Sequence, residues 1–301
     1  AVRLGFPLHP FRWKGHGSFG AIRQIVRNLQ IADPQVLHLH MTKDLWMTVP
    51  ALQWAGWKNP LFLTKHVGSS VRKKDPLHEW LYRRVDRVFT CSSVIRKNVL
   101  ATTPVSAEKV EVSYAPVDMD LFRFDAEKRK QVRASWNVRK HQWVVGMASR
   151  ISPGKGHETL MKAAALIRAE CPEVRFRMAG SPAHEEASYQ RDLLKMRDRL
   201  GLKGIFEYGG YVSDVPGFLS ASDLVVHAAQ AEAFGLAAVE ALACGRPVVG
   251  RAGEGLDEIL DEGAGGIRVD SDDPILWATA LKNLLKNKKQ YQVLSRRARK
   301  S

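Results

Sequence analysis

The sequence contains little cysteine and no long hydrophobic stretch. Its 301 residues include three cysteines, Cys91, Cys171 and Cys244, which are far apart and form no Cys-x-x-Cys pair. A disulfide-built scaffold is therefore excluded, and a reducing compartment is expected. No segment has the roughly eighteen consecutive apolar residues that a membrane-spanning helix needs. The sequence thus predicts a cytoplasmic protein, soluble or peripheral on the inner face of the cytoplasmic membrane.

Several signatures of nucleotide and acyl chemistry are also missing. Gly154 and Lys155 resemble part of a phosphate-binding loop, but that loop needs a glycine where Ser149 stands and a Ser or Thr where Gly156 stands. No Gly-x-Gly-x-x-Gly run follows a predicted strand, and no Gly-x-Ser-x-Gly nucleophile elbow occurs. These absences argue against a P-loop nucleotidase, a dinucleotide-binding enzyme and a serine hydrolase.

Positive charge is abundant, and it is concentrated in the first part of the chain. Of the net charge of +15, residues 1–140 contribute +13, from 24 Lys and Arg against 11 Asp and Glu. Residues 141–301 contribute +2, from 22 against 20. Such a local field attracts phosphate-bearing partners, whether glycolipids, anionic lipid headgroups or nucleic acid. The densest basic run is 65–97, where Asp75 and Pro76 predict the start of a basic amphipathic helix. That helix is either a packed surface helix or one that docks on a membrane.

Short apolar runs alternate with helical patterns, which is typical of parallel sheets covered by helices on both faces. The predicted class is α/β, with a domain boundary near Pro116 that separates residues 1–115 from 116–301. A connector and a solvated helix are expected over residues 114–141. Ligands of open parallel sheets bind at the carboxyl ends of the strands, so site residues are expected there. The predicted strands are Val36–His40, Leu61–His66, Arg87–Cys91, Lys109–Ser113, Trp143–Ala148, Val174–Ala179, Leu224–His227 and Pro247–Val249.

One apolar helix contains a single charged residue. Gly235 and Gly245 bound a run of good helix formers in which Glu240 is the only charge. The pattern predicts a helix buried on all sides, and a buried carboxylate requires hydrogen-bond partners. Sugar or ribose hydroxyls would serve, and the alternative is an internal arginine that only stabilises the core. Glu232, just before the helix, would face the same cleft. The amides of Gly235, Leu236 and Ala237 would form an anion site.

A second segment predicts a phosphate site. The strand Trp143–Ala148 leads into the glycine-containing loop 149–157, which carries Arg150 and Lys155. Arginine binds phosphate in a bidentate manner and lysine acts as a point charge, so the pair suits a diphosphate. The two segments together favour a sugar joined to phosphate.

These segments resemble the C-terminal domain of retaining glycosyltransferases of the GT-B fold, specifically glycosyltransferase family four. The resemblance covers residues 114–285 well and the earlier part more loosely. It implies two Rossmann-like parallel-sheet domains that face a cleft, with the first domain incomplete. The first β-α unit and the closing helix are expected to be missing, so the chain is expected to be a truncated copy of uncertain activity. The matching features are the Glu-x7-Glu motif from Glu232 to Glu240 with Phe234-Gly235-Leu236 inside it, Arg150 with Lys155-Gly156, and the run Ala243–Val249.

The resemblance also implies residue roles. In that family the first glutamate contacts the transferred sugar and the second binds the ribose, while the two cations hold the donor diphosphate. By position these roles fall on Glu232, Glu240, and Arg150 with Lys155. No cofactor is implied beyond the nucleotide-sugar substrate, and the chemistry is expected to be independent of metal. Further donor-binding residues are expected at Gly154, Phe234, Gly235, Leu236 and Ala237, with the base near Gly210, Tyr211 and Val212.

Histidines of the first domain are weighed separately. The run 61–68 resembles the family strand that ends in a histidine facing the sugar, which implies a catalytic role for His66; the alternative is an ordinary strand-end histidine. His38 and His40 share one face of a predicted strand. Without a third ligand at a suitable spacing, they are expected to be structural rather than metal-binding residues.

The implied function is transfer of a sugar, with retention, from a nucleotide donor to a hydroxyl of a glycan or lipid-linked acceptor. Cell-envelope polysaccharide or lipopolysaccharide biosynthesis is the expected context, and the basic first domain would contact an anionic membrane surface. The alternatives are a nucleotide-sugar epimerase or phosphorylase of the same fold, an inactive glycosyltransferase-like scaffold, and a non-catalytic basic binding protein. Nucleic acid is not an expected partner, because aromatic residues are not interleaved with the basic run.

Overall fold

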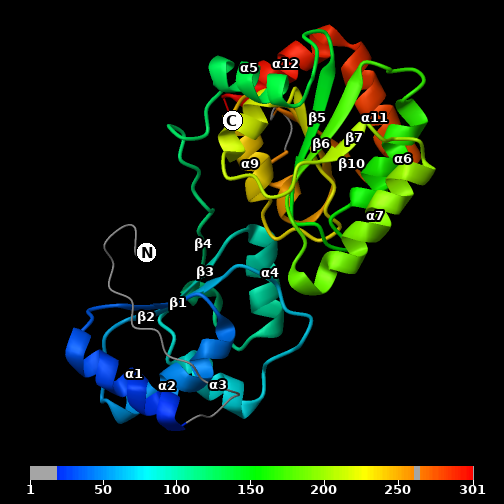
Figure 1. The fold of residues 1–301 in the computed structure, drawn as a ribbon. Coiled ribbons are helices and arrows are strands. Elements are labelled where there is room, and N and C mark those ends of the chain that lie inside the picture. The colour runs from blue at the N-terminus through cyan, green and yellow to red at the C-terminus, as the bar shows by residue number, and fades with distance from the viewer. Residues whose placement is uncertain (1–18, 261–264, 301) are drawn as a thin grey trace. The chain divides into compact units, whose positions relative to one another are not determined.

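The computed structural model describes residues 19–260 and 265–300, which form two compact units divided between Tyr114 and Ala115 (Figure 1). This division lies one residue from the boundary expected from sequence. Each unit is an α/β fold built on its own parallel sheet. The α/β fold class expected from the sequence is therefore confirmed.

The first unit contains a four-stranded sheet in the order β1-β2-β3-β4, with every neighbouring pair parallel. All four strands predicted from the sequence are present, and each is shorter than predicted. Figure 1 shows helices α1, α2 and α3 on one side of the sheet and α4 on the other. The strands are β1 (Leu37–Leu39), β2 (Leu61–Lys65), β3 (Arg87–Thr90) and β4 (Val110–Val112), and the helices are α1 (Phe19–Ala32), the short η2 (Thr42–Asp44), α2 (Leu45–Trp54), α3 (Pro76–Arg83), α4 (Ser93–Thr102) and η3 (Ala107–Lys109).

The second unit contains a six-stranded parallel sheet in the order β10-β9-β8-β5-β6-β7. The sequence analysis missed two of its strands, β7 (Phe206–Tyr208) and β10 (Gly266–Val269), which are the two edges of the sheet. Edge strands are short and half-exposed, so they lack the continuous apolar run that marks a central strand. The four predicted strands are β5 (Trp143–Ala148), β6 (Val174–Ala179), β8 (Leu224–His227) and β9 (Val248–Arg251).

Helices cover both faces of this second sheet. Figure 1 shows α6, α7 and α11 on one face, and α9 on the other. The first face buries Trp277, Phe176 and Phe206 in the larger apolar core, and α8 and α9 form a second core with β8 and β9. The helices are α5 (Ala126–Ser135), α6 (His157–Ile167), η4 (His184–Glu186), α7 (Ala187–Arg199), α8 (Val215–Ala221), α9 (Leu236–Ala243), α10 (Glu254–Asp257), α11 (Pro274–Lys286) and α12 (Lys288–Ala298).

The helix α5 is mostly exposed, as expected from the sequence, but one side of it packs on α8 and its Arg133 is only 7% exposed. Asp223, which precedes β8, accepts hydrogen bonds from Arg129 at 2.6 Å, from Arg133 at 3.1 Å and from the Val144 amide at 2.7 Å. The buried charges are therefore paired, which offsets their desolvation. Arg129 and Arg133, which look like surface charges in the sequence, thus bind α5 to the residue that precedes β8.

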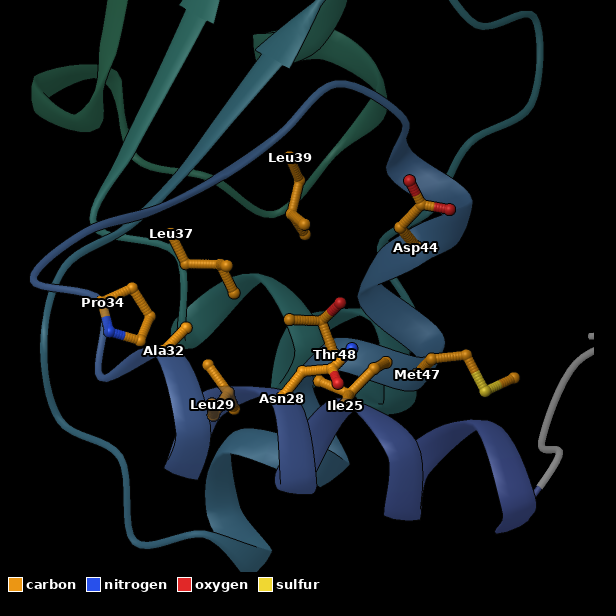
Figure 2. A pocket seen from close by; sticks show the side chains of 10 residues that line it. All are labelled: Ile25, Asn28, Leu29, Ala32, Pro34, Leu37, Leu39, Asp44, Met47 and Thr48. Atoms are coloured by element: carbon orange, nitrogen blue, oxygen red, sulfur yellow. The ribbon is translucent and has the colours of Figure 1, made fainter. Parts of the chain in front are cut away.

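A pocket of about 440 Å³ lies beside β1, the edge strand of the first sheet (Figure 2). Helices α1 and α2 and strand β1 supply its lining, which is mostly apolar, and among the described residues that line it Asp44 is the only charged one. Burial raises the pKa of Asp44 above its usual range.

Among the residues that the structure describes, no helix is both long and apolar enough to cross a bilayer.

Candidate functional site

A polar pocket of about 350 Å³ lies at the carboxyl ends of β5 and β8 in the second unit. This is the position at which open parallel sheets bind ligands. Three sequence-distant segments meet there: the loop after β5, the end of β8 and the start of α9. Their lining residues are Met147, Ala148, Ser149, Arg150, Lys155, Val226, His227, Ala228, Ala229, Glu232, Leu236 and Ala237. We refer to it as the donor pocket.

Opposite charges are paired inside the donor pocket. The Lys155 ammonium donates to Glu232 Oε2 at 3.2 Å, and His227 Nε2 lies 3.5 Å from the same oxygen. All three side chains are largely buried, with exposed fractions between 11% and 28%. Burial lowers the pKa of His227 below its usual value, and this outweighs the opposing effect of Glu232. The pocket therefore holds one cation and one carboxylate in contact, beside a histidine that favours its neutral form.

The loop that carries Arg150 and Lys155 is shaped by a glycine at its end. Gly156 caps α6 with a φ of +81°, and a Cβ at this position would lie 2.2 Å from the Ala228 carbonyl oxygen. Only glycine allows both this left-handed backbone and this close approach to the end of β8. The contact brings the residue before it, Lys155, across to Glu232. Arg150 is 62% exposed, and its Nε lies 3.8 Å from Glu186.

The start of α9 forms the remaining wall. Its N-cap is Gly235, with a φ of +99°, where a Cβ would lie 2.8 Å from Leu256. Leu236 and Ala237 line the pocket at the first turn, where backbone N–H groups have no partner within the helix. These amides and the helix dipole favour negative charge in the same space as Lys155.

Glu240 differs from its prediction. It is half-buried rather than enclosed, because Leu236 on the same helix is 42% exposed and the face they share is open. Burial alone raises the pKa of Glu240. Its side chain makes no ion pair or hydrogen bond with the residues described, so the internal-arginine alternative is wrong. Glu240 does not line the donor pocket itself; it lies one helical turn beyond Leu236 and Ala237.

A second pocket of about 310 Å³ adjoins the first and shares Ala148, Ser149 and Arg150 with it. Tyr211 and Val212 line this space, together with Phe218 and neighbouring residues. Tyr211 is 80% exposed and therefore presents an aromatic ring at the pocket mouth. The segment expected near the base thus lies next to the donor pocket, with Arg150 in the wall common to both.

The other predicted residues lie in supporting positions. Phe234 is buried beneath the start of α9, and the Gly154 carbonyl accepts a hydrogen bond from the Gln230 amide at 2.8 Å. Neither lines the pocket. His66 belongs to the first unit, where its Nε2 lies 3.3 Å from His40 Nδ1 and its ring stacks on that of His40. His38 extends the cluster through its contact with His40.

Sequence reasoning missed His227. It occupies the last position of a predicted strand, where an apolar residue is usual, and that polar interruption was the available signal. Its Nδ1 is buried without a side-chain partner among the described residues, and its Nε2 faces Glu232.

No group of three or more potential metal ligands occurs within residues 19–260 and 265–300. The chain does contain two Asp-x-Asp sequences, Asp118-Met119-Asp120 and Asp270-Ser271-Asp272. Asp118 accepts hydrogen bonds from backbone amides in its own turn, and Asp272 accepts a hydrogen bond from the Arg251 side-chain Nε at 2.7 Å. Neither sequence lines the donor pocket.

Two α/β units, each built on its own parallel sheet, are the architecture of the GT-B class of fold. The structure of Anabaena HepE in complex with UDP and glucose matches with a TM-score of 0.81 at 24% identity, covering 96% of this chain and 78% of that one. A glycosyltransferase from Rickettsia africae matches with a TM-score of 0.82 at 17% identity, covering 96% and 79%. These likenesses establish the fold.

Sequence comparison gives the family. The model described as glycosyl transferases group 1 matches residues 128–301, and the glycosyltransferase family 4 model matches residues 1–121. The chain belongs to the group 1 glycosyl transferases, as the sequence motifs indicated. A D-inositol 3-phosphate glycosyltransferase from a Nocardioides species is 29% identical over 280 residues, which is 84% of this chain. The chain spans 60% of that relative's length.

Proposed function

We propose that this protein transfers a sugar from a nucleoside-diphosphate sugar to an acceptor hydroxyl, with retention of the anomeric configuration. The contact between Lys155 and Glu232, in one pocket with the first turn of α9, carries this proposal. A cation and helix amides suit a diphosphate, and a carboxylate beside them suits the hydroxyls of the attached sugar. Membership of a glycosyltransferase family supports the same reading.

The donor would occupy both adjoining pockets. Its diphosphate would lie between Lys155, Arg150 and the amides of Leu236 and Ala237, while Glu232 would accept hydrogen bonds from the sugar. The base would enter the neighbouring space near Tyr211, and Glu240 would accept hydrogen bonds from the ribose. HepE was solved with UDP and with glucose, which is consistent with a uridine donor for this protein.

Catalysis would depend on stabilising the negative charge that develops on the leaving diphosphate. As the bond from the anomeric carbon to the diphosphate breaks, negative charge builds on the leaving phosphate oxygens. Lys155 and the α9 amides are held in a largely buried pocket, with the more exposed Arg150 at its wall, so they would stabilise this charge more in the transition state than in the ground state. We propose that these groups serve in place of a metal ion. Same-face attack of the acceptor on a short-lived oxocarbenium-like ion pair would then give retention.

The acceptor is proposed from charge and relatives. The Nocardioides relative is named for D-inositol 3-phosphate, and residues 1–140 carry a net charge of +13. A phosphorylated or lipid-linked hydroxyl acceptor fits this field. We place the reaction in cell-envelope glycan biosynthesis at the inner face of the membrane.

A product assay tests the proposal. The full chain is incubated with UDP-, GDP- or ADP-glucose, with and without D-inositol 3-phosphate, and product is followed by proton NMR. We expect acceptor-dependent release of one nucleotide and an α-anomeric product. Conversion of the donor to an epimeric nucleotide sugar, without an acceptor and without nucleotide release, would instead identify an epimerase, and a β-anomeric product would overturn retention.

A further inference from the structure

One residue near the donor pocket has a strained backbone. Glu254, the first residue of the short α10, has a φ of +52°, in the left-handed region that residues with a Cβ rarely adopt. The other non-glycine residues with positive φ in the described part of the chain are Asp33 and Asn137, residue types that tolerate this region better. Strain of this kind persists where the surrounding structure imposes it, and it is concentrated at functional sites.

The hydrogen bonds of this turn are made with Glu232. The Glu232 backbone N–H donates to Glu254 Oε2 at 2.8 Å, and the Gly255 N–H donates to the Glu232 carbonyl oxygen at 3.1 Å. Two successive residues of the turn therefore bind both polar groups of the Glu232 backbone.

The same turn packs on the residues that follow Glu232. A Cβ at Gly255 would lie 2.3 Å from the Ala233 carbonyl oxygen, so the two backbones are in direct contact there. A Cβ at Gly235, the N-cap of α9, would lie 2.8 Å from Leu256. Glu254, Gly255 and Leu256 thus contact the loop from Glu232 to the start of α9.

Glu232 requires this support because it lies outside any helix or strand, in the loop between β8 and α9. Its carboxylate nevertheless has a defined place, 3.2 Å from the Lys155 ammonium. Glu254 is exposed and does not line the donor pocket, so it contacts the site through the Glu232 backbone amide.

We propose that Glu254 is a positioning residue, whose carboxylate fixes the Glu232 backbone so that the Glu232 side chain points at the transferred sugar. The left-handed backbone of Glu254 is the conformation that places this carboxylate, and it lowers stability. The catalytic part of this inference rests on the proposed function, whereas the contact between the turn and the loop does not. Because the hydrogen bond is exposed, water can replace the carboxylate, and its loss should cost little stability.

Three variants of the full chain test the proposal. Glu254→Ala removes the carboxylate, Glu254→Gly removes both the carboxylate and the strain, and Glu254→Gln keeps an oxygen acceptor. We expect kcat for transfer to fall about tenfold in Glu254→Ala and Glu254→Gly, since a displaced catalytic group can cost up to about 10²-fold. UDP affinity should stay unchanged, because UDP lacks the transferred sugar that Glu232 would bind. Glu254→Gln should retain most of the rate.

Stability should change in a different order from activity. Glu254→Gly should melt about 1–4 °C higher than Glu254→Ala, because glycine adopts the left-handed backbone without strain. Asn137→Gly is the matched control, since Asn137 is exposed, has a φ of +54° and does not line the donor pocket. This control should leave transfer unchanged.

Amide hydrogen exchange, followed by NMR, adds a measurement that does not depend on activity. The Glu232 amide should exchange faster in Glu254→Ala than in the natural protein and in Glu254→Gln. Unchanged exchange in Glu254→Ala would overturn the positioning role and leave the donor pocket intact. A loss of transfer in Glu254→Gly that Glu254→Ala does not share would also overturn it, because backbone freedom would then be the cause.

The same measurements separate this inference from the proposed function. Faster exchange in Glu254→Ala, together with no transfer by the natural protein from any donor, would support the contact with Glu232. That result would overturn the proposed function, and with it the catalytic purpose of the contact. Loss of UDP binding in Glu254→Ala would overturn the assignment to the sugar, since the variant would then have disturbed the whole pocket.

Discussion

The two units differ in how positive charge is arranged near their strand ends. In the second unit Lys155 contacts Glu232 at 3.2 Å, whereas in the first unit the positive charge of Lys73 lowers the pKa of Lys65, adding to the effect of burial. A lysine paired with a carboxylate costs little in the empty protein, and we expect Glu232 to become available to sugar hydroxyls when a diphosphate engages Lys155. Repulsion between Lys65 and Lys73 instead opposes the folding of the first unit.

Removing the donor-pocket lysine would have the largest effect. Lys155→Met leaves Glu232 buried without its cation and takes away charge stabilisation of the leaving diphosphate. We expect kcat to fall about 10²–10³-fold, the loss seen for a single transition-state donor. Transfer rates measured with saturating donor check this. Lys162→Met, an exposed lysine on α6, is the control, and equal rates in the two variants would contradict the site.

A substitution of Glu240 is expected to change donor binding and protein stability in opposite directions. Glu240→Gln should weaken donor binding about tenfold, because an amide is a poorer partner than a carboxylate for ribose hydroxyls. Burial raises the folded-state pKa of Glu240, so the unfolded chain loses this proton first, and stability falls as pH rises above about 4.5. The variant should therefore melt higher than the natural protein at pH 7. Titration calorimetry with UDP and a thermal melt measure the two effects; a lower melting temperature would contradict the burial argument.

The lowered pKa of His227 predicts that the stability of the second unit depends on pH. Burial lowers its folded-state pKa, so below about pH 6.5 the unfolded chain binds a proton that the native state resists. Stability is therefore lost as pH falls through this range. His227→Asn should lose less stability than the natural protein between about pH 7 and pH 5. Urea unfolding at several pH values tests this, and parallel slopes for the two proteins would count against it.

The smallest effect is expected at Lys73 in the first unit. Lys73→Met removes a charge that repels Lys65, so the variant should melt about 1–3 °C higher. The gain should shrink as salt screens the charges of the natural protein. Lys58→Met, at an exposed lysine just before β2, should show no such shift. A lower melting temperature for Lys73→Met would show that the lysine stabilises the first unit, contrary to the comparison drawn between the two units.

Much of the fold could be predicted from local pattern. Every strand predicted from an apolar run is present, and Asp75 caps α3 with Pro76 at its first position, as the sequence indicated. The edge strands β7 and β10 were missed because they are short and half-exposed. The burial of Arg133 in the otherwise solvated α5 was not foreseen, since nothing local shows that Asp223, 90 residues after Arg133, binds it.

The candidate site was predicted in part. Arg150, Lys155 and Glu232 were expected together from motif and resemblance, and they line one pocket. Their roles, like that of His66, stay predictions. The partial exposure of Glu240 was not foreseen, because an alanine-rich helix carries no sign of which face is left uncovered.

By itself the sequence determined the alternation of strands and helices, the helix caps and the residue types available at strand ends, because these depend on neighbours within a few positions along the chain. Only the tertiary structure decided that Lys155 meets Glu232, that His227 joins them, and that Lys73 lies close enough to Lys65 to lower its pKa. Charge pairing acts through space over a few ångströms, and sheet order sets which distant loops come that close.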